Sequence, residues 1–555
     1  MSWLETAIAR ISPRWGLRRE IHRRQLDLLR GGAKRRRTFE AVAGGRMRKD
    51  MGRTGSSADQ AISGDIAALR EHVRYQEYQS GLFAGPIRRI VNNTVGRGII
   101  LRPTVSATDD LAVYQAGPKI TDAEAERWNR LAVRVWRRWC KQADMRLINS
   151  FYGIQRLALG AMIRDGEVLL ISRTSKRPGR VVPFCVEILE ADRLCTPMAE
   201  ASNPRIRHGI EYDDEGVPLR YYILRQHPGE SYATALRRDD FDAVDAFLPN
   251  GNRKVIHLFD PVRPEQTRGY SAFAPGLLDA QDLDRYREAE KYAAIMAASY
   301  VAAVEVENPQ QFAGAFGQTA GTDVGADGED YTRREFDFAP GATFVGRPGE
   351  KFKFNDPSRP AGAFAEYSYD LLQGPANALD MPPEVLAQRW SGLNYSNART
   401  ILLQFYASCW IRQGYLINHL CAPVYANLVA SAVSAGLLPG NHYSRRTHEL
   451  LSATWVPMIY RRWIDPGKES SGRETDLRTN VETLTETITE LGRDPDEHLE
   501  QRARELKRIR ELEEKYGVKF PSLGDAVETP ALDNEDGDDD GKKGQPRSVL
   551  QVLRS

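Results

Sequence analysis

Asp165 and Glu167 are the first residues whose types and spacing could do chemistry. With a later acid such as Glu187 they could bind a divalent cation, as a metal-dependent nuclease requires. The glycine between them favours another interpretation, because Asp-Gly-Glu joins a helical pattern to a strand-like apolar run and is typical of a turn. We therefore expect a structural turn here, with no catalytic residues.

The sequence lacks the common phosphate-binding and metal-binding motifs. The nearest match to a G-x-x-x-x-G-K-[ST] loop is Pro466-Gly467-Lys468-Glu469, which has neither the first glycine nor the hydroxyl. No H-E-x-x-H occurs, and the nine histidines have no metal-ligand spacing. His257 lies in an apolar run and is expected to be a buried, hydrogen-bonded histidine. We predict no enzymatic activity, no cofactor and no metal.

The cysteines and the hydropathy of the chain indicate its cellular compartment. Five cysteines form no C-x-x-C pair, which favours a reducing compartment with small buried thiols and no disulfides. No run of 18 or more consecutive apolar residues is present, and the first ten residues do not resemble a signal peptide. Neither secretion nor membrane insertion is expected.

The net charge of +2 conceals two oppositely charged ends. Residues 10–53 contain fifteen Lys or Arg and four acids, whereas residues 528–540 contain seven acids and no base. A basic arm can neutralise phosphates, or it can remain solvated or contact acidic protein partners. The acidic tail is expected to be disordered. We also expect both ends to be dispensable for assembly, because neither has a periodic apolar face to bury.

The first half of the chain alternates between helical and strand-like patterns. Helical spacing runs through 62–79, and Pro86 is expected to open a helix over 87–95. Thr121 and Glu124 have capping-box spacing before a helix with Trp128 and Trp139 on its apolar face. Strand-like runs cover 168–172, 184–189, 221–224 and 255–259, and the acidic turn 213–216 predicts a hairpin.

Helical patterns dominate the second half. Helices are expected at 276–304, at 361–379 and, as the longest, at 396–435 with a kink at Pro423. A Gly-rich excursion fills 308–330, and short β-like alternation follows over 336–354. The last helical region, 474–516, should break at 492–495. The fold class is therefore α+β and predominantly helical, with more than one module in 555 residues.

Several separated segments, in one order over about residues 60–510, resemble the portal proteins of lambda-type tailed bacteriophages. Residues 92–99, NNTVGRGI, are similar to the family's VNNVVGxGI, and Asp165-Gly166-Glu167 matches its DGE turn. The run 255–259, VIHLF, precedes a match to RPGQxRG formed by Arg263, Pro264, Gln266, Arg268 and Gly269. Glu265 departs from this pattern, since the family usually has glycine there, and this puts the local turn geometry in doubt.

Two further motifs complete the resemblance. Asn394, Tyr395, Ser396, Ala398 and Arg399 are close to NYSSAR. Trp463, Ile464, Asp465, Pro466, Lys468 and Glu469 are close to WIDPxKE. No residue in these motifs demands catalysis, and each has a structural interpretation as a turn residue, a helix cap or a packing aromatic.

The resemblance implies a dodecameric ring at one capsid vertex, through which double-stranded DNA passes without sequence-specific contacts during packaging and ejection. It also implies partners: the terminase large subunit, head-completion and connector proteins, and major capsid and scaffold proteins. The protein would act in the virion and assemble in the host cytoplasm. Membranes have no part in this function.

The portal fold of the family has wing, stem, clip and crown regions. The sequence fits that plan as a basic arm 1–59, wing 60–275, stem helix 276–304, clip 305–360, second stem helix 361–379, tunnel loop 380–395, long kinked helix and rest of the wing 396–473, crown helices 474–520 and acidic tail 521–555. The clip is the expected docking surface for the packaging motor and later for head-completion proteins, with adaptable backbone at 314–328.

The segment 380–394 is expected to leave the helical path at Pro382-Pro383 and to project as a loop into the channel. Its one cation, Arg389, lies beside Gln388 and Trp390, and these three are the expected DNA-facing side chains. Contact would be weak and directed at phosphates. In the alternative, Arg389 pairs with a neighbouring acid and Trp390 packs under the loop.

Two other functions remain open. A DNA-processing enzyme, either a nuclease or a packaging motor, would need a metal-carboxylate cluster or a phosphate loop. A non-portal capsid or scaffold protein could use a basic arm to bind the genome.

Overall fold

The computed structural model describes residues 55–107, 119–230, 240–299, 303–306, 322–324, 330–332, 350–353, 364–444, 446–457, 466–491, 493 and 495–520. The chain forms two compact units, residues 1–64 with 263–265, and 65–262 with 266–555. In the first unit, helix α3 (Ala58–Ile62) begins where the Ser57 hydroxyl accepts the Gln60 N–H. The other described helices and strands belong to the second unit.

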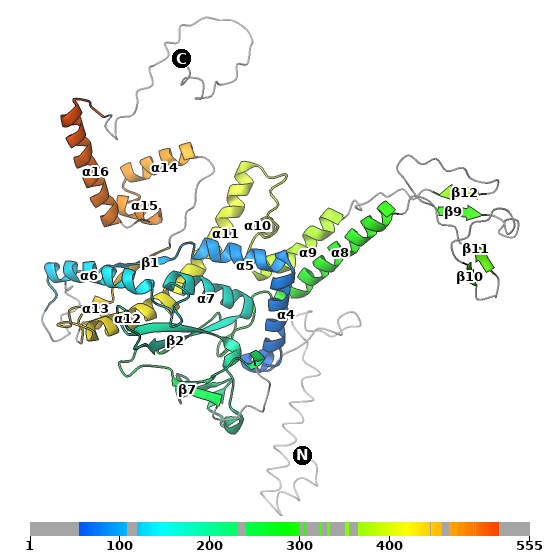
Figure 1. Cartoon of the computed structure of the whole chain (residues 1–555), viewed down its shortest axis with the longest axis horizontal. Helices are drawn as coiled ribbons and strands as arrows, with labels where there is room; N and C mark the ends of the chain where they lie inside the picture. The colour runs from blue at the N-terminus through cyan, green and yellow to red at the C-terminus, as the bar shows by residue number, and fades with distance from the viewer. Residues whose placement is uncertain are drawn as a thin grey trace, which may run out of the picture. The chain divides into compact units, whose positions relative to one another are not determined.

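Four helices build the first part of the core (Figure 1). They are α4 (Ile66–Gln79), α5 (Gly81–Thr94), α6 (Asp122–Cys140) and α7 (Phe151–Asp165). Thr121 and Glu124 form the expected capping box, and Trp128 and Trp139 are buried as expected. The start expected for α5 was wrong: the helix begins five residues before Pro86, because the Ser80 hydroxyl caps it and buried residues precede the proline.

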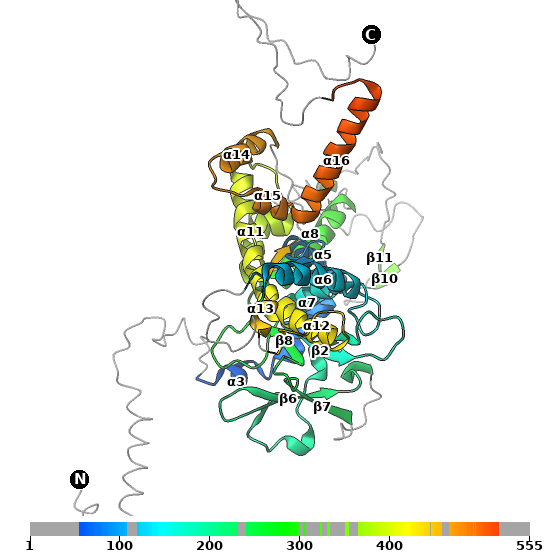
Figure 2. The same cartoon turned by 90° about the vertical axis from the view of Figure 1, so that its left-hand side faces the viewer.

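Two antiparallel sheets follow in the chain order that the apolar runs predicted. One has the order β3-β2-β8, from β2 (Glu167–Thr174), β3 (Phe184–Glu190) and β8 (Val255–Phe259). The other joins β4 (Ile206–Arg207), β5 (Ile210–Tyr212), β6 (Pro218–Leu224) and β7 (Phe241–Asp245), and β6 and β7 lie side by side in Figure 2. The predicted hairpin at 213–216 is confirmed, since β5 pairs with β6 across it. The first five residues of β2 are all buried, which explains its unbroken apolar run.

A pair of long helices extends the chain, α8 (Leu277–Ser299) and α9 (Phe364–Ala378), side by side in Figure 1. Tyr286 stacks on Phe364, with ring centroids 5.3 Å apart. At their base a Cβ on Gly276 would lie 2.6 Å from the Gly374 backbone, so only glycine permits this approach.

Short strands occur between these two helices. β9 (Ala303–Val306) pairs with β12 (Glu350–Lys353), and β10 (Thr322–Val324) pairs with β11 (Asp330–Thr332). β12 falls within the β-like alternation expected at 336–354. Most of the Gly-rich stretch 314–328 lies outside the described residues.

The longest predicted helix is confirmed, as α11 (Tyr395–Leu416), a π-helical turn (Ile417–Cys421) and α12 (Ala422–Ser434). The π turn ends two residues before Pro423, which has no N–H to donate to the His419 carbonyl. In length and hydropathy Tyr395–Ser434 could cross a membrane, but half of its most apolar window is buried inside the protein, as in a core helix.

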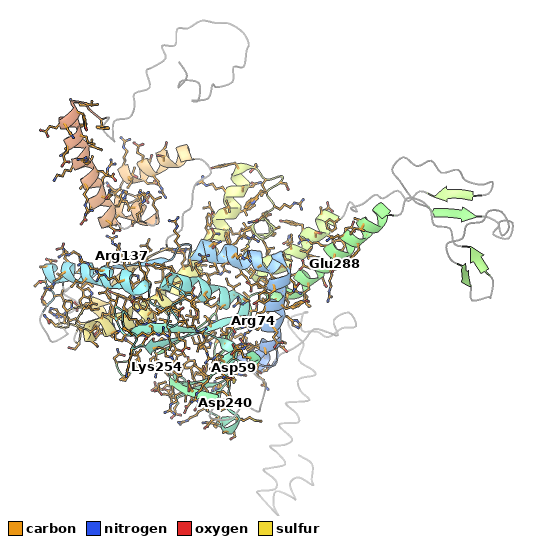
Figure 3. All side chains as sticks on the ribbon, in the orientation of Figure 1. Asp59, Arg74, Arg137, Asp240, Lys254 and Glu288 are labelled. Atoms are coloured by element: carbon orange, nitrogen blue, oxygen red, sulfur yellow. The ribbon has the colours of Figure 1, made fainter. Side chains whose placement is uncertain are left out.

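The C-terminal part contains α13 (Thr447–Leu450), strand β13 (Ala453–Pro457), which pairs with β1 (Ile99–Pro103), and three charged helices. The charged helices are α14 (Pro466–Arg478), α15 (Leu484–Glu490) and α16 (Pro495–Tyr516). The break expected before Pro495 is present, and a second one lies between α14 and α15. Arg137 of α6, labelled in Figure 3, forms an ion pair with Glu497 of α16 at 2.7 Å.

Candidate functional site

The motifs at 165–167, 255–259 and 266–269 meet in one buried cluster around the Glu167 carboxylate. Glu167 is the first residue of β2, and its side chain has no exposure to solvent. Its oxygens accept hydrogen bonds from Arg268 Nε (2.8 and 2.9 Å), Arg70 Nη2 (2.9 Å) and the Gly269 N–H (3.1 Å), and Oε2 lies 2.9 Å from His257 Nε2. A fully buried carboxylate with several charge-assisted hydrogen bonds holds the segments of its partners together and has a structural role.

Arg268 extends this cluster into the backbone of the neighbouring loops. Besides Glu167, its guanidinium donates to the carbonyls of Leu194 (3.0 Å) and Ala191 (3.1 Å). Gln266 supports the same turn, because its amide donates to the Arg268 carbonyl (2.7 Å). Arg268 therefore connects the segment after β8 to the loop after β3, and Gln266 stabilises the turn that carries it.

The glycines of these motifs allow two backbones to touch. Gly166 ends α7 with φ +89°, and a Cβ there would lie 2.2 Å from the Tyr270 backbone. A Cβ on Gly269 would lie 2.2 Å from the Gly166 carbonyl oxygen. The turn expected at Asp165-Gly166-Glu167 is thus present, and its glycine is required both by conformation and by packing.

The protonation of the cluster follows from its charges. Burial by itself raises the pKa of Glu167, but the Arg268 charge and the hydrogen bonds from His257 and Arg268 outweigh it and lower that pKa well below its usual range. Burial lowers the pKa of His257. Two arginines already contact the Glu167 carboxylate, so a protonated His257 would place a further positive charge beside them in a buried site. The expected buried, hydrogen-bonded histidine is confirmed.

The nuclease interpretation finds no free carboxylates among these acids. Asp165 is almost fully buried and bound by Arg74 (Nε to Oδ1, 2.7 Å), while Glu187 pairs with Arg173 at 2.8 Å. Sequence reasoning missed Arg74, and also Arg70, because both lie on α4 among other charged residues, with nothing local to mark partners more than ninety positions away. Arg74 is labelled in Figure 3.

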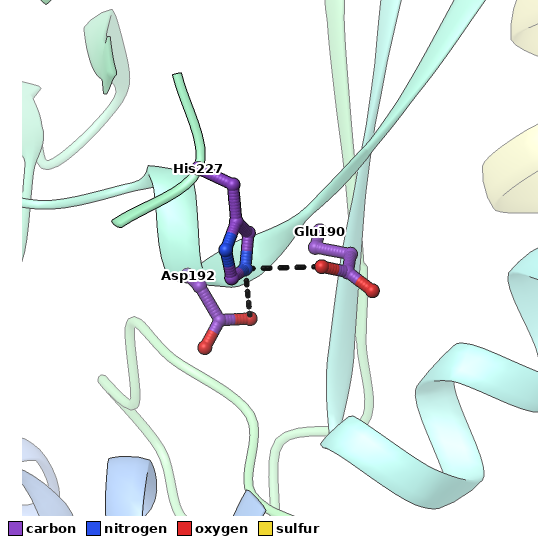
Figure 4. Close-up of side chains that lie close together, drawn as sticks. All are labelled: Glu190, Asp192 and His227. Atoms are coloured by element: carbon purple, nitrogen blue, oxygen red, sulfur yellow. Dashed lines mark ion pairs between the residues drawn. The ribbon is translucent and has the colours of Figure 1, made fainter. Parts of the chain in front are cut away.

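A second group of polar side chains has the residue types of a metal site, but arginines lie beside one of its carboxylates. His227 Nε2 lies 3.0 Å from Glu190 Oε2 and 3.9 Å from Asp192 Oδ2 (Figure 4). Asp192 is also paired with Arg74 (2.8 Å) and Arg70 (3.3 Å). Burial raises the pKa of Asp192, but these two arginines lower it further than burial raises it. A metal ion here would have to share the Asp192 carboxylate with these two positive charges, which disfavours its binding.

The segment 380–394, expected to be a loop throughout, contains helix α10 (Pro383–Ala387). That expectation was wrong for its first half, because Val385 and Leu386 are buried on one side of a short helix, and Met381 is buried just before it. Pro382 and Pro383 do break the preceding helix, as predicted, and Pro383 supplies a favourable first helical residue.

Hydrogen bonds from two long helices hold the base of this segment. Arg412 and Ser408 of α11 donate to the carbonyls of Leu379 (2.6 Å) and Asp380 (3.0 Å). Arg89 of α5 donates to the Leu386 carbonyl at 2.5 Å. The base is therefore fixed, residues 381–386 are buried or half-buried, and an exposed stretch begins at Ala387.

Gln388, Arg389 and Trp390 lie in that exposed part, which we call the exposed segment (residues 387–397). Gln388 ends α10 in the left-handed region, with φ +53°. Within the described residues the Arg389 guanidinium has no ion pair, and Glu384 instead accepts the hydroxyl of Tyr369 (2.8 Å). Trp390 is 42% exposed. This part of the chain presents to solvent one cation, Arg389, and two aromatic rings, Trp390 and Tyr395.

The remaining motif residues are structural or lie outside the described residues. Asn394 caps α11 by accepting the Asn397 N–H (2.8 Å), and Tyr395, Ser396 and Arg399 are exposed on its first turns. Asp465 lies outside the described residues, and Lys468 belongs to α14.

Arg263 and Glu265 lie in the first unit. Arg263 is exposed and donates to the Ser56 carbonyl (3.3 Å). Glu265 has φ +65°, so the position where the related motif has glycine adopts the backbone region that glycine favours. The local turn geometry is thus kept despite the departure from the pattern.

Comparison with known proteins gives one consistent result. The family model described as "Phage portal protein, lambda family" matches residues 44–413, more than half of the chain. A probable portal protein of Halomonas phage phiHAP-1 is 24% identical over 92% of this chain and 93% of its own. Portal protein B of Escherichia phage lambda is 21% identical, over 74% of this chain and 78% of its own. Among solved structures, a chain in the neck of a native gene transfer agent particle, computed with C12 symmetry, matches with 14% identity and a TM-score of 0.40, over 81% of this chain and 98% of that one.

Proposed function

Because the chain belongs to the lambda family of phage portal proteins, which are structural virion components and not enzymes, we propose that it forms the dodecameric ring at one capsid vertex through which DNA is packaged and ejected. The exposed segment is the observation that carries this proposal within the chain. Its base is fixed by α5 and α11, and its tip carries only Arg389 as a cation.

Weak contact is what a conduit requires. Twelve copies of the exposed segment around a channel would present a ring of single arginines to the DNA phosphates. Phosphate contacts carry no sequence information and weaken with salt, so DNA can slide past them. Trp390 adds bulk at the same level.

The family plan divides the chain in the following proposed way. The helices and sheets of 60–275 with 396–473 form the wing, α8 and α9 form the stem, and the β9–β12 segment belongs to the clip. The end of α14 from residue 474, together with α15 and α16, belongs to the crown. The close contact at Gly276 and Gly374 supports paired stem helices, because it holds α8 and α9 together at their base. The exposed segment is the tip of the tunnel loop.

The proposed partners follow this division. The clip would bind the terminase large subunit during packaging and head-completion or connector proteins afterwards, while the wing would contact major capsid and scaffold proteins. Substitutions in residues 305–360 should then impair motor docking and head completion. If they left both intact while wing substitutions abolished both, the clip assignment would be wrong.

Electron microscopy of the purified full-length protein tests the function. Closed rings of twelve subunits with an open channel are expected, together with no ATP hydrolysis and no cleavage of DNA in the presence of Mg²⁺. Shells, sheets or monomers in place of rings would favour a non-portal capsid or scaffold protein, and hydrolysis of either substrate would favour a DNA-processing enzyme.

A further inference from the structure

One face of α11 carries an exposed apolar stripe. Leu403, Trp410 and Ile411 are 51, 72 and 69% exposed, and Ala407 is exposed between them. These positions are spaced by three, four and seven residues, so they share a side of the helix. The opposite side, which includes Phe405, is buried in the core. Contiguous exposed apolar surface of this kind marks an interaction site.

Gly414 continues the stripe by one further turn. A Cβ at Gly414 would meet no atom within 4 Å, so nothing inside the subunit requires a glycine there. Glycine inside a helix costs about 1 kcal/mol relative to alanine. A neighbouring molecule that approaches the helix backbone closely gives a reason for the glycine.

We infer that this face, formed by Leu403, Ala407, Trp410, Ile411 and Gly414 and called here the α11 stripe, is a contact surface between adjacent subunits of the ring. The inference rests on the proposed function. α11 starts within the exposed segment, which that function places at the channel. Near the axis of a closed ring every subunit is flanked by a copy on each side, so a helix that leaves the channel wall has a neighbouring subunit beside it.

The chemistry of the stripe fits a protein surface that is buried on assembly. No Asp or Glu occurs anywhere in residues 395–434, so the stripe buries no carboxylate. Large apolar side chains alternate with the small residues Ala407 and Gly414 along the stripe. Side chains of the neighbouring subunit can therefore pack into the grooves above the small residues. A ring contact is heterologous, so the stripe meets a different surface of the next subunit rather than another α11 stripe.

Two substitutions test the surface in the full-length protein. Trp410→Glu places a charge in the contact, and Gly414→Leu fills the space that a close partner would occupy. Leucine has high helix propensity and finds open space within the subunit, so this variant should fold even if Trp410→Glu does not. Met198→Glu, at a site 82% exposed in the loop after β3, and Gly472→Leu, at a glycine of α14 with equally open space, are the matched controls.

Mass photometry at one subunit concentration measures the share of protein in rings, and circular dichroism checks folding. We expect the ring share to fall at least tenfold for Trp410→Glu and Gly414→Leu and to stay unchanged for both controls. Normal rings with a folded Gly414→Leu variant would overturn the inference while leaving the proposed function intact. A wild-type protein that forms no rings would contradict the proposed function itself. Wild-type monomers that bind neutral phosphatidylcholine vesicles through Trp410 would assign the stripe to a lipid surface instead and also overturn the inference.

Discussion

The Glu167 carboxylate and the Arg268 guanidinium form a buried ion pair, with Oε1 and Nε 2.8 Å apart, although the two residues are 101 positions apart in the chain. Arg70 donates to the same carboxylate, so the pair also ties α4 to β2 and to the turn after β8. Removing Arg268 would leave this buried carboxylate with one arginine where the intact cluster has two, and would break several charge-assisted hydrogen bonds at once.

Arg268→Met should therefore lower the free energy of unfolding by about 3–5 kcal/mol. The matched control is Arg220→Met, which breaks the exposed pair with Asp245 and should cost less than about 1 kcal/mol. Urea titration at one protein concentration measures both. A loss for Arg268→Met no larger than that of the control would show that the buried pair does not stabilise the fold.

Stability should fall as the pH is lowered from 7 towards 5 because of His257. Its pKa in the folded protein is lowered by burial, whereas the unfolded chain takes up the proton near pH 6.5. Below that pH the unfolded state binds more protons than the folded state, which favours unfolding by up to about 1.4 kcal/mol per pH unit. His257→Gln keeps an amide that can donate to Glu167 and should flatten this slope. An unchanged slope in urea titrations at pH 7, 6 and 5 would exclude His257 as its source.

Glu265→Gly should stabilise the protein by about 0.5–1 kcal/mol. Glu265 has φ +65°, where a side chain is strained and glycine is not, although glycine loses more backbone entropy on folding. Glu265→Ala is the control, because alanine keeps the Cβ and should give no such gain. Equal urea midpoints for the two variants would show that backbone strain at this position is negligible.

Much of the local structure could be predicted from the sequence, but the buried cluster could not. The apolar runs at 168–172 and 255–259 and the capping box at Thr121 are local signals, and the structure confirms them. The partners of Glu167 lie on α4 and after β8, about a hundred residues away in the sequence. A local sequence pattern cannot predict contacts between residues so far apart in the chain. The loop expected at 380–394 was half wrong, because the two prolines predict a loop, whereas Pro383 is the first residue of α10 and Val385 and Leu386 are buried.

Deleting residues 1–54 and 521–555 together should leave ring formation unchanged. Neither end has a periodic apolar face, so neither offers a surface whose burial would stabilise an interface. The measurement is the ring share of the truncated protein by mass photometry, beside the full chain. Loss of rings on truncation, with the melting temperature kept, would assign one of the ends to the subunit contact.

Arg389→Glu should leave rings intact but reduce the packaging and retention of full-length DNA. Arg389 is exposed, and among the described residues it has no ion pair to lose, so its replacement should not destabilise the subunit. In the proposed ring the change replaces twelve cations beside the DNA phosphates with twelve anions. At physiological salt, charges repel one another over about 8 Å. Side chains that line a narrow channel would lie within this distance of the DNA phosphates.

Arg389→Gln separates loss of attraction from gain of repulsion and should have the smaller effect. Arg134→Glu on α6 is the matched control, because it reverses an exposed charge that has no ion pair among the described residues and lies outside the exposed segment. DNA protected from nuclease in purified particles gives the packaged amount, and its length on a gel gives the completeness of packaging. Rings that contain Arg389→Glu and yet retain full-length DNA as wild type does, with the exposed segment located at the channel, would remove Arg389 from DNA passage and leave Trp390 as the contact to examine.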